Sequence, residues 1–154
     1  MTKLELIEGR LHDNSIKLYE FAIDDSIRAM SHVVQGRKSI ALNRAVLHDK
    51  ADETSVLAEE LGHFETGAFY EITPTFNAPA IRSTRRKLEG MAKSWAYKEY
   101  CPPDEIEAAF EQEGDYGDYA VAEWCGVSVT FLHRAIEFHR SCGVVFSFDD
   151  CDCA

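Results

Sequence analysis

The first third of the chain distributes apolar and polar residues in a way that predicts one helix and then a strand. Within residues 2–12, Leu4, Ile7 and Leu11 recur at helical spacing, which is typical of a short amphipathic helix. Residues 16–23 alternate between apolar and polar side chains instead. This period of two is typical of a half-buried strand.

Two further extended runs, residues 29–34 and 39–42, lie on either side of the segment Gln35-Gly36-Arg37-Lys38. The spacing between these runs predicts a β-hairpin. We therefore expect the first third of the chain to form a helix followed by a small, mostly antiparallel sheet.

From about Asp52 the apolar residues follow a helical period, and Gly67 stands where a C-terminal cap would end that helix. A second helix is predicted from about Thr84 to Tyr100, where Cys101 and two prolines end it. The intervening residues 66–83 contain two prolines and little periodicity. We expect them to form a long loop, of the kind that often carries function.

The composition changes after Pro103, since residues 103–132 hold eight acidic side chains and no Lys or Arg. Two or three short helices are expected here, followed by a longer one from Ser128 to about Arg140. The apolar run at residues 144–148 predicts a short final strand. We accordingly divide the chain into an α+β domain, residues 1–102, and an acidic helical module, residues 103–154.

Within the acidic module, Ala122, Gly126 and Leu132 have the spacing of a helix-turn-helix, in which glycine makes the turn. Only Arg134 and Arg140 on the following helix could neutralise phosphates, so direct nucleic-acid binding is disfavoured. We interpret this motif as a packing unit that can also dock a partner protein.

Length and charge narrow the classes of protein further. The chain has 154 residues, with 16 basic against 27 acidic side chains and a net charge of −11, which suits one compact domain with a small module and disfavours binding to polyanions. No apolar stretch reaches the roughly 20 residues that a membrane span needs. The first residues lack a signal-peptide pattern, and the five cysteines form an odd, scattered set. We expect a cytoplasmic protein with reduced thiols.

The segment that carries candidate chemistry is Glu59-Glu60-Leu61-Gly62-His63. Residues four apart on a helix share one face, so Glu59 and His63 can hold one metal ion, while Glu60 points aside. This is the geometry of the HExxH metallopeptidase helix, in which the second residue is the general base. A divalent metal is therefore expected, and zinc is the first choice.

Glu59 stands where that motif has its first histidine, and the exchange changes the charge of the site. With a second carboxylate ligand, the ligands cancel the charge of a divalent ion, so bound water loses its proton less readily. Oxygen-rich ligation also admits manganese or iron. The third ligand is expected to be Glu89, which lies 26 residues after His63. An ion pair between Glu89 and Lys93, four residues on, is the alternative role for that carboxylate.

Two segments resemble the ImmA/IrrE family of metallo-endopeptidases: LAEELGHFETG at residues 57–67 and LEGMAKSWAYKEYCPP at residues 88–103. The resemblance implies a zincin-like helix pair with Glu59, His63 and Glu89 as metal ligands. Glu60 would be the catalytic carboxylate. It also implies an enzyme that cleaves a helix-turn-helix repressor, as such enzymes of phages and other mobile elements do.

Other aspects of the function stay open at this point. Tyr70, Arg82 and Tyr97 are candidates to stabilise an oxyanion, although Tyr97 also suits the core and Arg82 the solvent. Met91 stands where many members of the family have a further Glu. If the true third ligand aligns with Met91, the site is incomplete, and the alternative is a non-catalytic protein that binds a transcriptional regulator.

Overall fold

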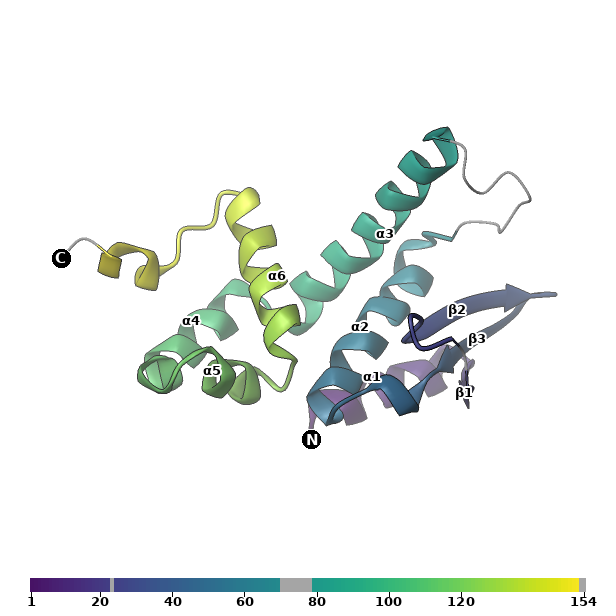
Figure 1. Ribbon diagram of the computed structural model, residues 1–154, viewed down its shortest axis with the longest axis horizontal. Coiled ribbons are helices and arrows are strands. Elements are labelled where there is room, and N and C mark those ends of the chain that lie inside the picture. Colours follow the sequence, from purple (N-terminus) through teal and green to yellow (C-terminus); the bar gives the residue numbers. More distant parts are fainter. Residues whose placement is uncertain (23, 70–78, 153–154) are drawn as a thin grey trace.

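The computed structural model describes residues 1–22, 24–69 and 79–152, and within these ranges it combines a three-stranded sheet with six α-helices (Figure 1). The fold class is α+β, as the sequence predicts. Three short 3₁₀ segments complete the described elements: η1 (Arg44–Val46), η2 (Gly114–Tyr116) and η3 (Ser147–Asp152).

The N-terminal helix α1 (Lys3–Asp13) confirms the predicted amphipathic pattern, because its three apolar stripe residues are buried. Thr2 and Glu5 form a capping box. The Thr2 hydroxyl accepts the backbone N–H of Glu5, and the Glu5 carboxylate accepts the backbone N–H of Thr2. Since both groups would otherwise be unsatisfied at the helix start, this pair fixes where α1 begins.

The sheet contains β1 (Ile16–Glu20), β2 (Ala29–Val34) and β3 (Arg37–Leu42), with β3 in the centre. The predicted hairpin of β2 and β3 is confirmed, and its turn consists of Gln35 and Gly36, both at positive φ. Such two-residue turns match the twist of antiparallel strands.

The prediction of a mostly antiparallel sheet is wrong for β1, because β1 pairs with β3 in parallel. β1 and β2 lie on opposite sides of β3 in the sheet. The chain reverses direction between β1 and β2 and again in the hairpin between β2 and β3, so β1 and β3 run the same way. Alternation of apolar residues reports which face of a strand is buried and carries no information about the direction of its neighbour.

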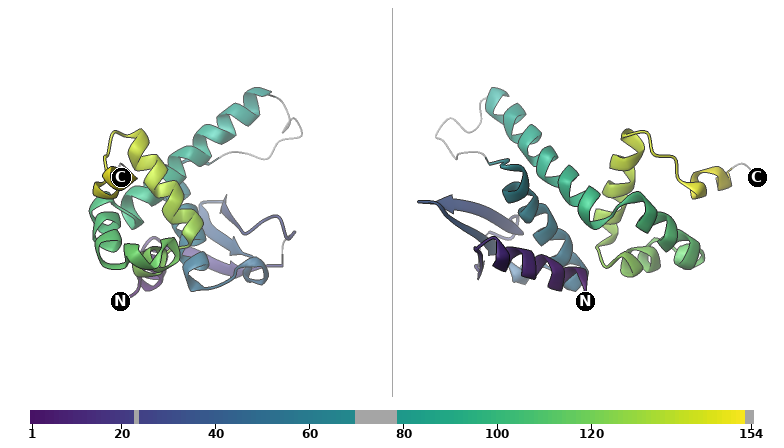
Figure 2. Two further views of the ribbon diagram at one scale, coloured as in Figure 1. Left: turned by 60° about the vertical axis from the view of Figure 1, so that its left-hand side comes forward. Right: turned by 180° about the vertical axis from the view of Figure 1, so that it is seen from behind.

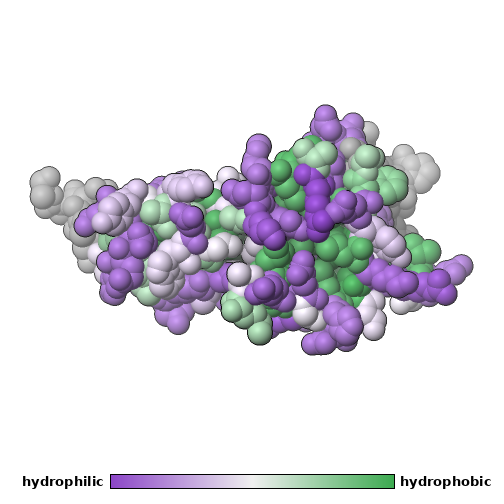
Figure 3. Space-filling model, turned by 90° about the horizontal axis from the view of Figure 1, so that it is seen from below, coloured by the Kyte–Doolittle hydropathy of each residue, from purple (hydrophilic) through white to green (hydrophobic). Residues whose placement is uncertain are grey.

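One face of the sheet packs on the helices. Ile16, Ile40 and Leu42 are buried there, whereas Tyr19 and Phe21 remain exposed. Seen from below, apolar side chains gather on the half of the molecule that holds α1 and the sheet (Figure 3).

The two long helices are α2 (Lys50–Thr66) and α3 (Pro79–Tyr100), and α2 lies between α3 on one side and α1 and the sheet on the other (Figure 2). The sequence placed the start of α3 five residues too late, so residues 79–83 of the predicted loop are helical. Proline suits the first turn of a helix, where its missing N–H is not needed, and Pro79 begins this one. The rest of that loop from residue 70 to 78 lies outside the described residues.

The C-terminal part consists of α4 (Pro103–Glu113), α5 (Asp118–Cys125) and α6 (Val129–Ser141). These helices confirm the prediction of short helices followed by a longer one. Gly126 has a φ of 66° and makes the turn between α5 and α6, as the helix-turn-helix spacing requires.

The predicted final strand at residues 144–148 is wrong, because the segment enters η3 and is far from the sheet (Figure 1). Its aromatic residues pack toward a helix instead, and Phe146 is buried while Phe148 is partly buried. Phe146 stacks on Phe148, and Phe148 stacks on Phe110 of α4, with ring centroids 4.9 and 3.9 Å apart. An apolar run forms a strand only where a partner strand is within reach.

A single hydrophobic cluster runs through the described residues, from α1 and the sheet to α6. Tyr97 of α3 links the two parts by packing on Phe131 and Phe138 of α6, with centroids 5.0 and 5.8 Å apart. None of the helices in the described ranges is long and apolar enough to span a membrane.

Candidate metal and proton-transfer site

The C-terminal cap of α2 sets the chemical form of His63. Gly67 adopts the left-handed conformation with φ of 66°, and the next residue, Ala68, then donates its N–H to the carbonyl of His63 at 3.1 Å. In return, the Ala68 carbonyl lies 2.6 Å from Nδ1 of the His63 ring. A carbonyl oxygen can only accept, so Nδ1 carries the hydrogen.

With its hydrogen on Nδ1, a neutral His63 ring has its lone pair on Nε2. This is the form in which histidines bind metals, with the other ring nitrogen donating to a carbonyl or carboxylate. His63 is itself buried at 7% exposure, and the ring of Phe69 lies beside it with a centroid distance of 6.2 Å. The ring is therefore held in one orientation before any ligand arrives.

The close crossing of α2 and α3 brings Glu89 to that free nitrogen. A Cβ atom added at Gly62 would lie 2.3 Å from the carbonyl oxygen of Ala92, so the two backbones touch where Gly62 lacks a side chain. His63 follows Gly62, and Glu89 lies almost one turn before Ala92. As a result, Nε2 of His63 and Oε1 of Glu89 are 3.6 Å apart.

The donor set formed by His63 and Glu89 fits a divalent cation. A separation of 3.6 Å is too long for a good hydrogen bond, and it is near the separation of about 3.4 Å expected for two ligands of one tetrahedral zinc ion. One imidazole nitrogen and one carboxylate oxygen suit zinc, manganese or iron. The structure therefore brings together two of the three side chains that the sequence predicts as ligands.

The third predicted ligand, Glu59, is not gathered with them. Among the residues that the structure describes, no three His, Cys, Asp or Glu side chains are placed to share one metal ion. Burial raises the pKa of Glu59, while the charges of Lys93 and Arg134 act in the opposite direction. Glu59 is thus close enough to Lys93 and Glu89 for their charges to affect its pKa, but its role as a metal ligand stays a prediction.

The carboxylate of Glu60, predicted as the general base, is held from the sheet. The hydroxyl of Ser31 on β2 donates a hydrogen bond to Glu60 Oε2. Burial raises the pKa of Glu60, and this effect outweighs the Ser31 hydrogen bond and the charge of His63, which lower it. A carboxylate whose pKa is raised is a stronger base and accepts a proton more readily.

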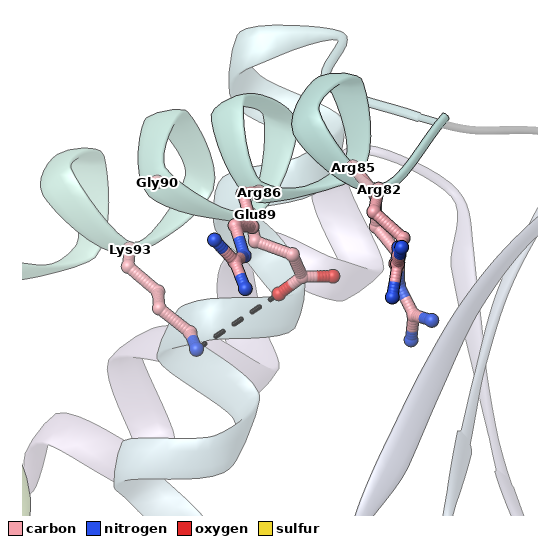
Figure 4. A pocket seen from close by; sticks show the side chains of 6 residues that line it. All are labelled: Arg82, Arg85, Arg86, Glu89, Gly90 and Lys93. Carbon is pink, nitrogen blue, oxygen red and sulfur yellow. Dashed lines mark ion pairs between the residues drawn. The ribbon is translucent and has the colours of Figure 1, made fainter. Parts of the chain in front are cut away.

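Glu89 has a second neighbour on its own helix. The ammonium group of Lys93 lies 3.9 Å from Glu89 Oε2, and the dashed line in Figure 4 marks this ion pair. The ion pair that the sequence offered as an alternative role is thus present together with the approach to His63. Oε1 of Glu89 thus faces the imidazole of His63, and Oε2 faces the ammonium group of Lys93.

The three oxyanion candidates have different surroundings. Tyr97 is buried at 6% exposure, and burial followed by the charge of Glu59 raises its pKa to about 12, while Arg134 acts in the opposite direction. Arg82 is exposed and lines an open pocket at Glu89. Tyr70 lies outside the described residues.

Sequence reasoning missed Ser31, Ala68 and Arg134. Ser31 and Arg134 come from elements distant in sequence, and no local pattern indicates that they reach α2 and α3. Ala68 contributes only its backbone carbonyl, yet the glycine before it is a recognisable helix-end signal. That signal could have indicated that the chain turns back over the last turn of α2, where His63 lies.

Comparisons with known proteins add no family. No protein-family model, no curated protein and no solved structure matches this chain.

Proposed function

We propose that this chain is a metal-dependent endopeptidase that cleaves a regulatory protein of the helix-turn-helix repressor type, in the manner of enzymes from phages and mobile elements. The observation that carries the proposal is the free Nε2 of His63, which faces Glu89 Oε1 across 3.6 Å. Where the imidazole is neutral, its Nε2 lone pair and the carboxylate oxygen repel each other, and either a metal ion or a proton between them removes that repulsion.

His63 and Glu89 would hold the metal, with Glu59 as the third ligand one turn before His63 on α2. When bound, a divalent ion polarises a peptide carbonyl and lowers the pKa of water. The Ala68 carbonyl keeps His63 in the metal-binding tautomer. Zinc is the first choice of metal, and manganese or iron are the alternatives.

Glu60 would accept the proton of the attacking water and later pass it to the leaving amine. Its pKa is raised by burial, which favours proton uptake, and the Ser31 hydroxyl fixes one carboxylate oxygen so that the other is available. Tyr97 and Arg134 stand near Glu59 and could assist the carbonyl oxygen of the substrate.

The test measures how three variants with substitutions in α2 bind metal and cleave a helix-turn-helix repressor, which serves as the substrate. We expect Glu60→Gln to keep the metal and to lower kcat by about 10²- to 10⁴-fold, since only proton transfer is removed. His63→Ala should lose the metal itself. Glu65→Gln, an exposed carboxylate on the same helix, is the matched control and should keep both properties.

Metal content is measured by elemental analysis and cleavage by mass spectrometry of the products. Turnover by Glu60→Gln at the rate of the unaltered protein would reject the proton-transfer role. Cleavage that persists in His63→Ala without metal would reject the metal-dependent mechanism.

A second candidate function is a non-catalytic protein that binds a transcriptional regulator. The ion pair of Lys93 with Glu89 favours it, because an internal ammonium group already supplies positive charge to one ligand oxygen. Stoichiometric metal that a chelator removes would favour the enzyme. A metal-free protein that binds the repressor equally well with and without chelator would favour the second function.

A further inference from the structure

Helix α3 is positively charged in a chain that is otherwise acidic. Residues 79–100 hold six basic side chains and two acidic ones, whereas the whole chain has a net charge of −11. Four of the basic residues line one open pocket of about 520 Å³ together with Glu89 and Gly90. We call these four residues the basic rim: Arg82, Arg85, Arg86 and Lys93.

The spacing along α3 places the basic rim on one face. Arg82, Arg86, Glu89 and Lys93 follow one another at intervals of four, three and four residues, which stack side chains on the same side of a helix. Figure 4 shows the side chains of Arg82, Arg85 and Arg86 leaving α3 on the same side as Glu89. The three arginines are exposed, so an incoming ligand can reach them.

The same pocket leads to the candidate site. Glu89 lines the pocket, and its Oε1 atom lies 3.6 Å from His63 Nε2. A ligand bound along the basic rim therefore shares a pocket with Glu89, which would help to hold the metal. Guanidinium groups pair with carboxylates through two parallel hydrogen bonds, which gives orientation as well as attraction.

From these observations we infer that the basic rim binds acidic side chains of the polypeptide substrate and so selects acidic segments for cleavage. This inference rests on the proposed endopeptidase function for its substrate, though the binding can be measured without catalysis. A nucleic acid is the less favoured polyanion, because the rim occupies one face of one helix while the rest of the chain repels a long polyanion.

The test uses two fluorescein-labelled peptides of about twelve residues with the same sequence, except that one carries glutamates where the other carries glutamines. Binding is measured by fluorescence anisotropy with chelator present, so that no cleavage occurs. Arg82→Gln/Arg86→Gln is the test variant, since Arg85 already has another interaction in the structure. Lys87→Gln/Lys98→Gln is the matched control, because it removes the same charge from α3 at a different pocket.

We expect the acidic peptide to bind the unaltered protein more tightly than its glutamine counterpart, and the test variant to weaken that binding by about tenfold or more. The control variant should change it by less than about twofold. Equal losses in both variants, no preference for the acidic peptide, or tighter arginine-dependent binding of single- or double-stranded DNA would each overturn the inference.

A separate cleavage assay, with metal added, distinguishes failure of this inference from failure of the proposed endopeptidase function. Cleavage that ignores acidic residues would sink the inference and leave the endopeptidase intact. Arginine-dependent binding of the acidic peptide, without any metal or cleavage, would support docking at the rim and reject the endopeptidase.

Discussion

The crossing of α2 and α3 and the helical module of α4 to α6 hold their charged residues in opposite ways. At the crossing, Glu59 and Glu60 are partly buried, and burial raises the pKa of both. In the module, charged groups pair at the surface. Asp118 and His133, for example, contact each other at 2.6 Å while their side chains are 55% and 50% exposed.

The difference between the two regions indicates where reactive chemistry can occur. Water screens the surface pairs, so they contribute little to the free energy of unfolding and mainly keep the module solvated. At the crossing, the carboxylates of Glu59 and Glu60 are partly withdrawn from water, so the pKa of each depends more strongly on a few named neighbours. A raised carboxylate pKa beside a histidine with one free nitrogen is the kind of arrangement found at functional sites.

The largest expected effect comes from closing the gap at Gly62. Gly62→Ala places a methyl group against the Ala92 carbonyl, which belongs to the backbone and cannot rotate away, so the helices must separate. We expect the free energy of unfolding to fall by about 2–3 kcal/mol. Urea denaturation measures this, and metal uptake should weaken because His63 and Glu89 move apart.

Gly90 provides the matched control on α3. No atom lies within 4 Å of a Cβ added there, so Gly90→Ala should raise the free energy of unfolding by about 0.5–1 kcal/mol through helix propensity. If both substitutions changed stability equally, the close crossing would not be what positions the site.

An intermediate effect is expected from the charge of Glu60 in metal-free protein. The folded state holds the Glu60 proton more tightly than the unfolded chain, whose pKa is near 4.5. This group's contribution to stability is therefore complete below pH 4.5 and is lost as the pH rises through the raised pKa. Glu60→Gln cannot ionise, so its stability relative to the unaltered protein should rise over that range.

Urea denaturation at a series of pH values, with chelator present, measures this difference. Glu111→Gln, an exposed carboxylate on α4, is the control and should stay within about 0.5 kcal/mol of the unaltered protein. A stability difference for Glu60→Gln that is the same at pH 4 and at pH 8 would contradict the assigned effect of burial.

The smallest effect is expected in the module. Asp118→Asn removes the surface pair with His133 and should change the free energy of unfolding by less than about 0.5 kcal/mol, because water already screens both groups. A loss comparable to that of Gly62→Ala would show that the module depends on its surface charges as strongly as the crossing depends on its packing.

Much of the secondary structure follows from local pattern. The stripe in residues 2–12 predicts α1, and the apolar period with Gly67 predicts α2 and its end. The direction of β1 and the conformation of residues 144–148 do not follow, because both depend on which element lies beside them. A strand pattern needs a partner, and the partner comes from the path of the whole chain.

The sequence by itself determined the helices, the hairpin and the identity of the candidate residues, because helical period, turn glycines and residue spacing are local properties. Only the tertiary structure decided that His63 Nε2 is free and faces Glu89, that Ser31 reaches Glu60, and that Lys93 shares Glu89. Those relations depend on the close approach of α2 and α3 and on the fold of the sheet against α2, which bring together groups that are distant in sequence.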